Sequence, residues 1–216
     1  MTHRFTLPER MTMWLLYRVS IVMYGGGSVP VLQEGFKTLG FRGYFRFLKV
    51  AAKITTELQN EFGGEIAQHL IGIAAMWIGC SFCGYNHVMS GALIYFRDSG
   101  DLHPLTPSTM ALMFDMRDEE ALAHMQGLLA DPRHERLRLL VTRMYSLYMG
   151  TAQAETADDH LLMSCLWVWR WTTECSIIEG VEIKPEDAWA IHEVGRDKAL
   201  IKRYKRAVAA RNKARD

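Results

Sequence analysis

One short stretch of the chain, IGCSFCGYNHVMSGA (residues 78–92), contains three side chains that can carry out redox or metal chemistry: Cys80, Cys83 and His87. At about 100° per residue, these three residues fall within roughly 60° of one another on a helix that begins near Cys80. The N-terminus of a helix lowers the pKa of a cysteine placed there, and an imidazole one turn later can act as its base. The spacing therefore supplies a thiolate, a base and a second, resolving thiol, as the two-electron reduction of a peroxide or a disulfide requires.

Two other interpretations of the same stretch stay open. A zinc site needs a fourth ligand, and no second Cys/His pair follows at finger or ribbon spacing, so the candidates are His69, His103 and Glu65. Alternatively, the thiols are inert core residues, because a glycine and several large apolar residues surround them. We favour the redox pair, although not of the thioredoxin type, since the βαβ pattern of that fold is missing.

The elements that must position these residues are helices. Hydrophobic periodicity is helical nearly everywhere, and no alternating run of five or more residues indicates a strand. Capping signals predict helix starts at Thr106-Pro107, Asp131-Pro132, Thr156 with Asp159, and Lys184-Pro185. The helix that starts at residue 131 should end near residue 150, and the one that starts at residue 156 should end near residue 180. Glycine-rich interruptions at 25–30, 40–43, 63–64 and 79 separate helices in the first half of the chain, among them 44–60 and 65–77. We expect an all-α fold of roughly nine helices.

The length of 216 residues predicts a single domain, residues 1–216. Residues 98–104 (DSGDLHP) are the best candidate for a connection within it. They would join an N-terminal half, about 1–97, which carries the Cys-x-x-Cys motif, to a C-terminal half, about 105–216.

Composition excludes several classes of function. The chain is 49% hydrophobic and 23% charged with a formal net charge of +1, which gives no electrostatic case for a nucleic-acid or membrane partner. The apolar run 11–24 is too short to span a bilayer and has no signal-peptide cleavage pattern, so we expect a cytoplasmic protein. Residues 198–215 carry eight Lys or Arg and no acidic residue, which we interpret as a solvated or frayed terminal helix.

Apolar residues gather in two further stretches. Residues 11–24 and 161–171 hold more bulky apolar surface than a small monomer usually buries, which predicts a homo-oligomer. Trp167, Trp169 and Trp171 alternate within the second stretch, and we expect them on a helix that is buried on several sides. Cys165 and Cys175 would lie about 15 Å apart along that helix, too far for a disulfide, so we expect buried free thiols.

The motif resembles that of a known family. An apolar helix, then Gly79-Cys80-x-x-Cys83-x-x-x-His87, then a second apolar helix is similar to the AhpD-like alkylhydroperoxidases of the carboxymuconolactone decarboxylase superfamily, over residues 65–92. The resemblance implies an all-helical bundle that forms trimers or larger rings. It also implies that Cys83 attacks a hydroperoxide, that Cys80 resolves the product into a disulfide, and that His87 belongs to a proton relay.

The relay departs from the family's pattern at one position. Where the family places a glutamate, twelve residues before Cys80, this chain has Gln68, which can orient an imidazole but cannot take a proton. Glu65 lies one turn earlier on the same predicted face, about 5 Å along the axis, and is the acid that could substitute.

Three functional hypotheses follow. The first is a thiol-dependent peroxidase that needs no cofactor or resident metal and is reset by a dithiol protein or a small dithiol. The second is a non-enzymatic helical sensor or interaction protein whose Cys-x-x-Cys is structural or binds zinc. The third is a lactone decarboxylase or another non-peroxidase enzyme of the same superfamily, for which two cysteines would be unnecessary.

Overall fold

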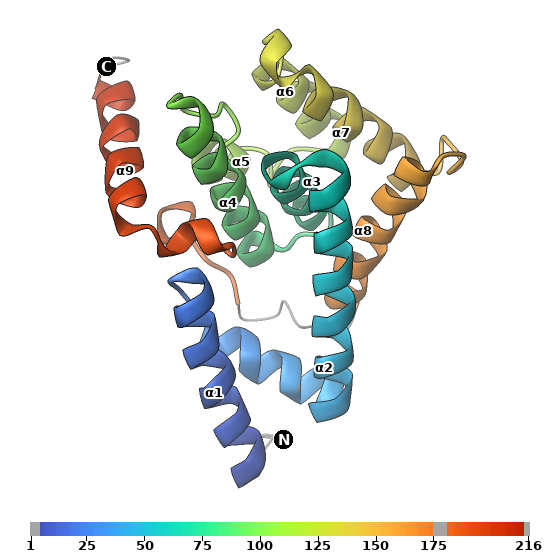
Figure 1. Ribbon diagram of the computed structural model, residues 1–216. Helices are drawn as coiled ribbons and strands as arrows, with labels where there is room; N and C mark the ends of the chain where they lie inside the picture. Colours follow the sequence, from blue (N-terminus) through green and yellow to red (C-terminus); the bar gives the residue numbers. More distant parts are fainter. Residues whose placement is uncertain (1–4, 175–180, 214–216) are drawn as a thin grey trace.

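The computed structural model describes residues 5–174 and 181–213, and in these residues it has nine α-helices, three short 3₁₀ helices and no strand (Figure 1). The all-α prediction and the expected number of helices are confirmed for this part of the chain. The α-helices are α1 (Leu7–Tyr24), α2 (Val29–Phe62), α3 (Gly64–Trp77), α4 (Ser81–Ser99), α5 (Pro107–Ala111), α6 (Asp118–Leu128), α7 (Glu135–Tyr148), α8 (Ala157–Glu174) and α9 (Lys198–Lys213), and the 3₁₀ helices are η1 (Pro132–His134), η2 (Pro185–Asp187) and η3 (Glu193–Arg196).

The capping signals identified helix starts more reliably than helix lengths. The backbone N–H groups of Thr156 and Asp159 donate to each other's side chains, each at 3.1 Å, which confirms the predicted capping box of α8. Thr106 caps α5 as expected, but that helix is only five residues long. The prediction of a helix after Lys184 was wrong, because η2 is a single 3₁₀ turn of three residues.

Helix α2 consists of two helical parts that meet at Gly40, within the glycine-rich stretch where we expected a break. Gly40 has a φ of 64° and a ψ of 174°, a conformation in which a residue with a β-carbon would be strained. The predicted interruption is therefore confirmed, but it is a kink at the single residue Gly40 and not a connecting loop. The first part of α2 therefore crosses the lower end of the second part at a steep angle (Figure 1).

The core is built around the antiparallel pair α3 and α4, against which the second part of α2, α7 and α8 pack. A glycine allows the pair to approach closely. A β-carbon at Gly72 would lie 2.7 Å from Cγ2 of Val88 and 3.0 Å from the carbonyl oxygen of Gly84. Every residue of α3 from Ala67 onward is buried, so polar side chains on its inner face are held in a nearly dry environment.

The tryptophans of α8 lie on a helix, as expected, but not all of them are covered. Trp169 is buried, whereas Trp167, on the opposite face, is 59% exposed, so the prediction of burial on several sides was wrong for Trp167. Cys165 is buried and reduced. The side chain of Trp171, as well as Cys175 and the expected helix end near residue 180, lie outside the described residues.

The terminal helices lie on the same side of the molecule, at the left of Figure 1, with α9 above α1. Helix α1 packs on the first part of α2 through Met13, Phe36 and Tyr44. Helix α9 packs on α4 through Leu200 and Tyr204. All of its basic residues except the partly buried Arg211 are exposed, which agrees with the solvated helix predicted for 198–215 over the residues that the structure describes. Among the helices that the structure describes, none has the length and apolar character needed to cross a membrane.

Candidate active site

The connection between α3 and α4 places Cys80 at the start of a helix. Gly79 has a φ of 81°, which turns the chain after α3, and the Cys80 N–H then donates to the carbonyl oxygen of Ala75 at 2.9 Å. Cys80 itself is extended and is the N-cap residue of α4. Its Sγ accepts a hydrogen bond from the backbone N–H of Cys83 at 3.3 Å, the bond that a serine or aspartate cap would make.

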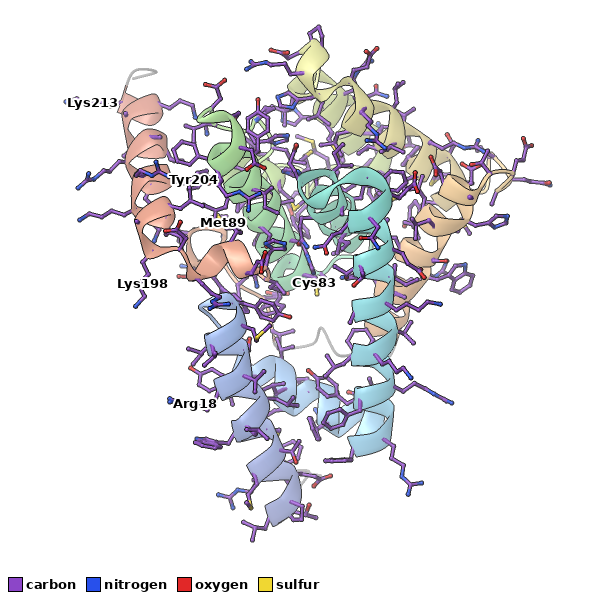
Figure 2. The ribbon with its side chains drawn as sticks, viewed as in Figure 1. Arg18, Cys83, Met89, Lys198, Tyr204 and Lys213 are labelled. Atoms are coloured by element: carbon purple, nitrogen blue, oxygen red, sulfur yellow. The ribbon has the colours of Figure 1, made fainter. Side chains whose placement is uncertain are left out.

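The two thiols have different electrostatic environments. The Cys83 side chain donates a hydrogen bond that lowers the pKa of Cys80, with further help from the N–H groups at the start of α4. The same interaction, together with burial, raises the pKa of Cys83. Cys80 is only 1% exposed, whereas Cys83 is partly exposed and lies at the end of α4 that faces α1 and α2 (Figure 2). The negative charge of the reduced pair therefore resides mainly on Cys80.

His87 is held by Gln68. Its Nδ1 atom lies 2.8 Å from Oε1 of Gln68, across the close contact between α3 and α4. Because a carbonyl oxygen only accepts, Nδ1 carries the proton and Nε2 keeps its lone pair. Burial, together with the nearby His192, lowers the pKa of His87 to about 3, so the ring is neutral near pH 7. The edge of Trp169 packs against this ring, with the centroids 5.6 Å apart.

Glu65 lies elsewhere. Its Oε1 atom is 3.3 Å from Nε2 of His103 and 3.7 Å from Nδ1 of His69. Glu65 begins α3 whereas Cys80 follows its end, which separates them by roughly 18 Å along the helix axis. The structure thus brings Gln68 to His87 and Cys80 to Cys83, but it groups Glu65 with two other histidines. A zinc ion shared by the cysteines and Glu65, His69 or His103 is excluded by this distance.

Tyr44 of α2 is a neighbour of the thiols that the sequence did not point to. Burial, and then the charge at Cys83, raise the pKa of Tyr44 to about 12, so its hydroxyl stays protonated and lies close enough to respond to that sulfur. Tyr44 is 4% exposed. No local spacing relates Tyr44 to the motif, because it reaches the site from a different helix.

The segment between α8 and α9 covers the beginning of α4. The backbone N–H of Ile183 donates to the Ser81 hydroxyl at 3.3 Å, and that of Trp189 donates to Oδ1 of Asn86 at 2.8 Å. The ring of Trp189 also meets Phe82 edge to face. These contacts satisfy the Ser81 hydroxyl and Oδ1 of Asn86, whereas Nδ2 of Asn86 is buried without a hydrogen-bond partner.

Comparisons of the chain with family models, with curated proteins and with solved structures give no match. The resemblance in residues 65–92 therefore rests on the motif alone. The geometry around that motif consists of a buried, activated thiol next to a partly exposed one, with a neutral, oriented imidazole one turn further along α4.

Proposed function

We propose that the chain is a thiol-dependent peroxidase that reduces hydroperoxides through a Cys80/Cys83 dithiol–disulfide cycle. The observation that carries this proposal is the position of Cys80 at the N-cap of α4, where the Cys83 N–H and the Cys83 thiol both stabilise its thiolate. Thiolates, not thiols, attack peroxides, and a second thiol within reach converts the product into a disulfide. A structural or inert pair would not require the pKa of one thiol to be lowered while the pKa of the other is raised.

The reaction balances with these two residues alone. The Cys80 thiolate attacks the outer oxygen of ROOH, the O–O bond breaks, and Cys80 becomes a sulfenic acid while the alkoxide leaves. Cys83 protonates the alkoxide to ROH, and its thiolate then attacks the Cys80 sulfur. The S–S bond forms and hydroxide departs, to be protonated by solvent. A dithiol, either a small molecule or a partner protein, then reduces the disulfide.

This order of attack differs from the one that the resemblance implies. There Cys83 attacks with His87 as its base and Cys80 resolves. In this site, however, the pKa of Cys83 is raised and that of His87 is about 3. Each pKa unit by which the Cys83 thiol exceeds His87 adds about 1.4 kcal/mol to the free energy of proton transfer from the thiol to the imidazole. We therefore assign the first attack to Cys80 and propose that His87, oriented by Gln68, relays the Cys83 proton to the alkoxide, so that the Cys83 thiolate can attack the Cys80 sulfur. Because Cys80 is only 1% exposed, we expect small hydroperoxides to react faster than bulky ones.

The setting of this activity is part of the proposal. A dithiol cycle requires a compartment that keeps thiols reduced, which favours the cytoplasm. We propose a homo-oligomer, a trimer or a multiple of it, and neither a nucleic acid nor a membrane as a partner. The reaction as written needs no bound cofactor.

The test is oxidation of the reduced chain with one equivalent of hydroperoxide, followed by mass mapping of the cysteines. We expect a single intramolecular Cys80–Cys83 disulfide and a reduced Cys165, because burial raises the pKa of the Cys165 thiol. With a small dithiol present, turnover should vanish in Cys80→Ser and Cys83→Ser and persist in Cys165→Ser. Peroxide treatment that leaves Cys80 and Cys83 unlinked would contradict the proposed function.

A further inference from the structure

A second group of chemically capable side chains lies at the other end of the α3–α4 pair. Glu65, His103 and His134 each offer one nitrogen or oxygen donor atom, and these three atoms lie within 4.8 Å of one another. They come from three separate segments: the first turn of α3, the connection between α4 and α5, and the end of η1. Neither the thiol chemistry nor the His87–Gln68 pair uses them.

The group is mostly buried, and one of its donor atoms lacks a partner. His103 is 0% and His134 is 5% exposed, whereas the Glu65 side chain is 28% exposed and connects the group to solvent. Nε2 of His103 is buried without a hydrogen-bond partner, although Oε1 of Glu65 lies 3.3 Å away, because the two groups are not aligned for a bond. An unpaired buried nitrogen is costly unless something else satisfies it.

The other nitrogen of His103 shows how Nε2 can become a ligand. Nδ1 lies 3.1 Å from the carbonyl oxygen of Leu105, to which it can donate a proton, although the N–H of Leu105 is equally near. In the tautomer that donates to the carbonyl, Nε2 carries a lone pair that no hydrogen bond uses. Histidines that bind metals are typically held in this way, with the other ring nitrogen donating to a backbone carbonyl.

We propose that Glu65, His103 and His134 bind a divalent transition-metal ion. Two imidazoles and one carboxylate are a donor set that suits Zn²⁺ and Fe²⁺ and leaves at least one coordination position open for water or a small ligand. Around a tetrahedral ion with bonds of 2.0–2.2 Å, donor atoms lie about 3.4 Å apart. The separation of 3.3 Å between Glu65 and His103 already matches this value, and small side-chain rotations would bring in the third donor.

The surroundings of the three residues favour a cation. His69 stacks on the His103 ring, with centroids 4.1 Å apart, which fixes the ring plane. The Glu65 carboxylate lies against two of the rings, 3.3 Å from Nε2 of His103 and 3.7 Å from Nδ1 of His69, and supplies negative charge that a cation would offset.

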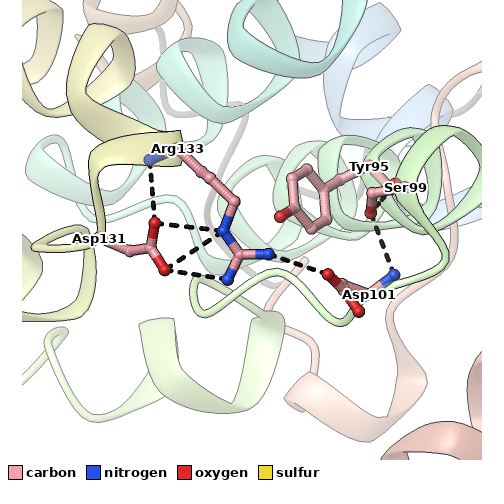
Figure 3. Close-up of polar contacts among 5 residues, drawn as sticks. All are labelled: Tyr95, Ser99, Asp101, Asp131 and Arg133. Atoms are coloured by element: carbon pink, nitrogen blue, oxygen red, sulfur yellow. Dashed lines mark hydrogen bonds and ion pairs between the residues drawn. The ribbon is translucent and has the colours of Figure 1, made fainter.

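A network of ion pairs holds the two histidine-bearing segments together (Figure 3). Arg133, next to His134, is 2.9 Å from Asp101 and 2.9 Å from Asp131. Asp101 belongs to the connection that carries His103, so the network links both segments. The two carboxylates also offset the positive charge of Arg133, which would otherwise oppose a bound cation.

The experiment uses the full chain without a histidine tag. Elemental analysis of the protein as purified identifies the metal, and calorimetric titration of the chelator-treated protein with Zn²⁺ and, under anaerobic conditions, Fe²⁺ measures affinity. We expect about one ion per chain. Glu65→Gln and His134→Gln should each weaken binding of the preferred ion tenfold or more. His160→Gln, at an exposed position on α8, is the matched control and should bind like the wild type.

Two further measurements separate this proposal from its rivals. Circular dichroism of each variant checks the helix content, and Glu65→Gln keeps the shape of a partly exposed side chain, so a loss of binding in a folded variant is specific. The Cys80→Ser/Cys83→Ser double variant should retain the metal. A wild type that takes up neither ion, unchanged binding in Glu65→Gln and His134→Gln, or loss of the ion in the cysteine variant would each overturn the proposal. None of these results depends on peroxidase activity.

Discussion

Nδ1 of His87 and Oε1 of Gln68 lie 2.8 Å apart, and both side chains are buried where α3 and α4 cross. The neutral amide fixes the orientation of the imidazole without adding charge to the site. A carboxylate in the same place would stabilise the imidazolium and raise the pKa of His87 from its low value of about 3. The identity of residue 68 therefore determines how good a base His87 is.

Gln68→Glu should speed formation of the Cys80–Cys83 disulfide at neutral pH by about tenfold or more, since it converts His87 into a better proton acceptor. Gln68→Leu should slow it, because the ring loses its partner. Glu65→Gln is the matched control and should leave the rate unchanged, as its carboxylate lies against His103. Stopped-flow oxidation with a small hydroperoxide measures all three. If Glu65→Gln were the variant that slows oxidation, Glu65 would be the relay acid after all.

The unequal thiols predict which sulfur reacts first. Limited alkylation of the reduced protein near pH 7 should label Cys80 before Cys83, because the pKa of Cys80 is lowered and that of Cys83 is raised. Cys83→Ala should raise the pKa of Cys80, measured from the ultraviolet absorbance of the thiolate, since it removes the side-chain donor to the Cys80 sulfur and keeps only the backbone N–H. Preferential labelling of Cys83 at low reagent concentration would instead support the order implied by the family resemblance.

The contact between α3 and α4 depends on Gly72. Gly72→Ala would place a β-carbon 2.7 Å from Cγ2 of Val88 and 3.0 Å from the Gly84 carbonyl, both in a packed interface. We expect a loss of about 1–3 kcal/mol in the free energy of unfolding, measured by urea denaturation. Gly127→Ala, also in a helix but with no atom within 4 Å of the added carbon, should be neutral or stabilising by up to about 1 kcal/mol. Equal effects at both positions would show that helix propensity, not the contact, decides the outcome.

The sequence predicted the local features of the site and missed the ones that depend on chain packing. Glycine and capping signals near residues 79–80 act within a few residues, so the start of α4 at Cys80 could be foreseen. The motif and its offset from Gln68 also follow from helix periodicity. Tyr44, whose pKa is raised by burial and then by Cys83, comes from the second part of α2, and no spacing within the motif relates the two residues.

The histidine cluster was hidden for a similar reason. The sequence indicates Glu65 as a relay acid or a zinc ligand and His103 as a zinc ligand, and it does not point to His134, because no regular spacing connects the three residues. They meet because α3 and α4 are antiparallel and because η1 folds back toward the connection after α4. Sequence periodicity describes one helix at a time and contains no information about contacts between residues of different segments.

His87 should make stability depend on pH in the acidic range. Its folded-state pKa of about 3 lies below the usual 6.5, so between these values the unfolded chain binds the extra proton. The contribution of His87 to the free energy of unfolding is fully present above about pH 6.5 and is lost as the pH falls toward 3. Between pH 7 and pH 5 this loss amounts to about 2 kcal/mol. Urea unfolding at pH 7 and pH 5 measures how much the free energy of unfolding decreases between the two values. This decrease should be smaller by about 2 kcal/mol in His87→Gln than in the wild type or in His160→Gln. Identical losses in all three proteins would place the acid sensitivity in other groups.

Helix α1 presents an apolar face to solvent. Met11, Trp14 and Val22 are 63%, 64% and 66% exposed, and they recur at helical spacing along one side of the helix. Because monomers rarely expose contiguous apolar surface of this kind, we expect wild-type protein at micromolar concentration to sediment as a homo-oligomer, for which the family resemblance implies a trimer or a multiple of it. Trp14→Glu with Val22→Glu should shift it toward the monomer. Leu139→Glu changes a residue that is 57% exposed on α7 and should leave the assembly intact. A monomeric wild type would exclude the predicted homo-oligomer, and dissociation by Leu139→Glu alone would move the interface from α1 to α7.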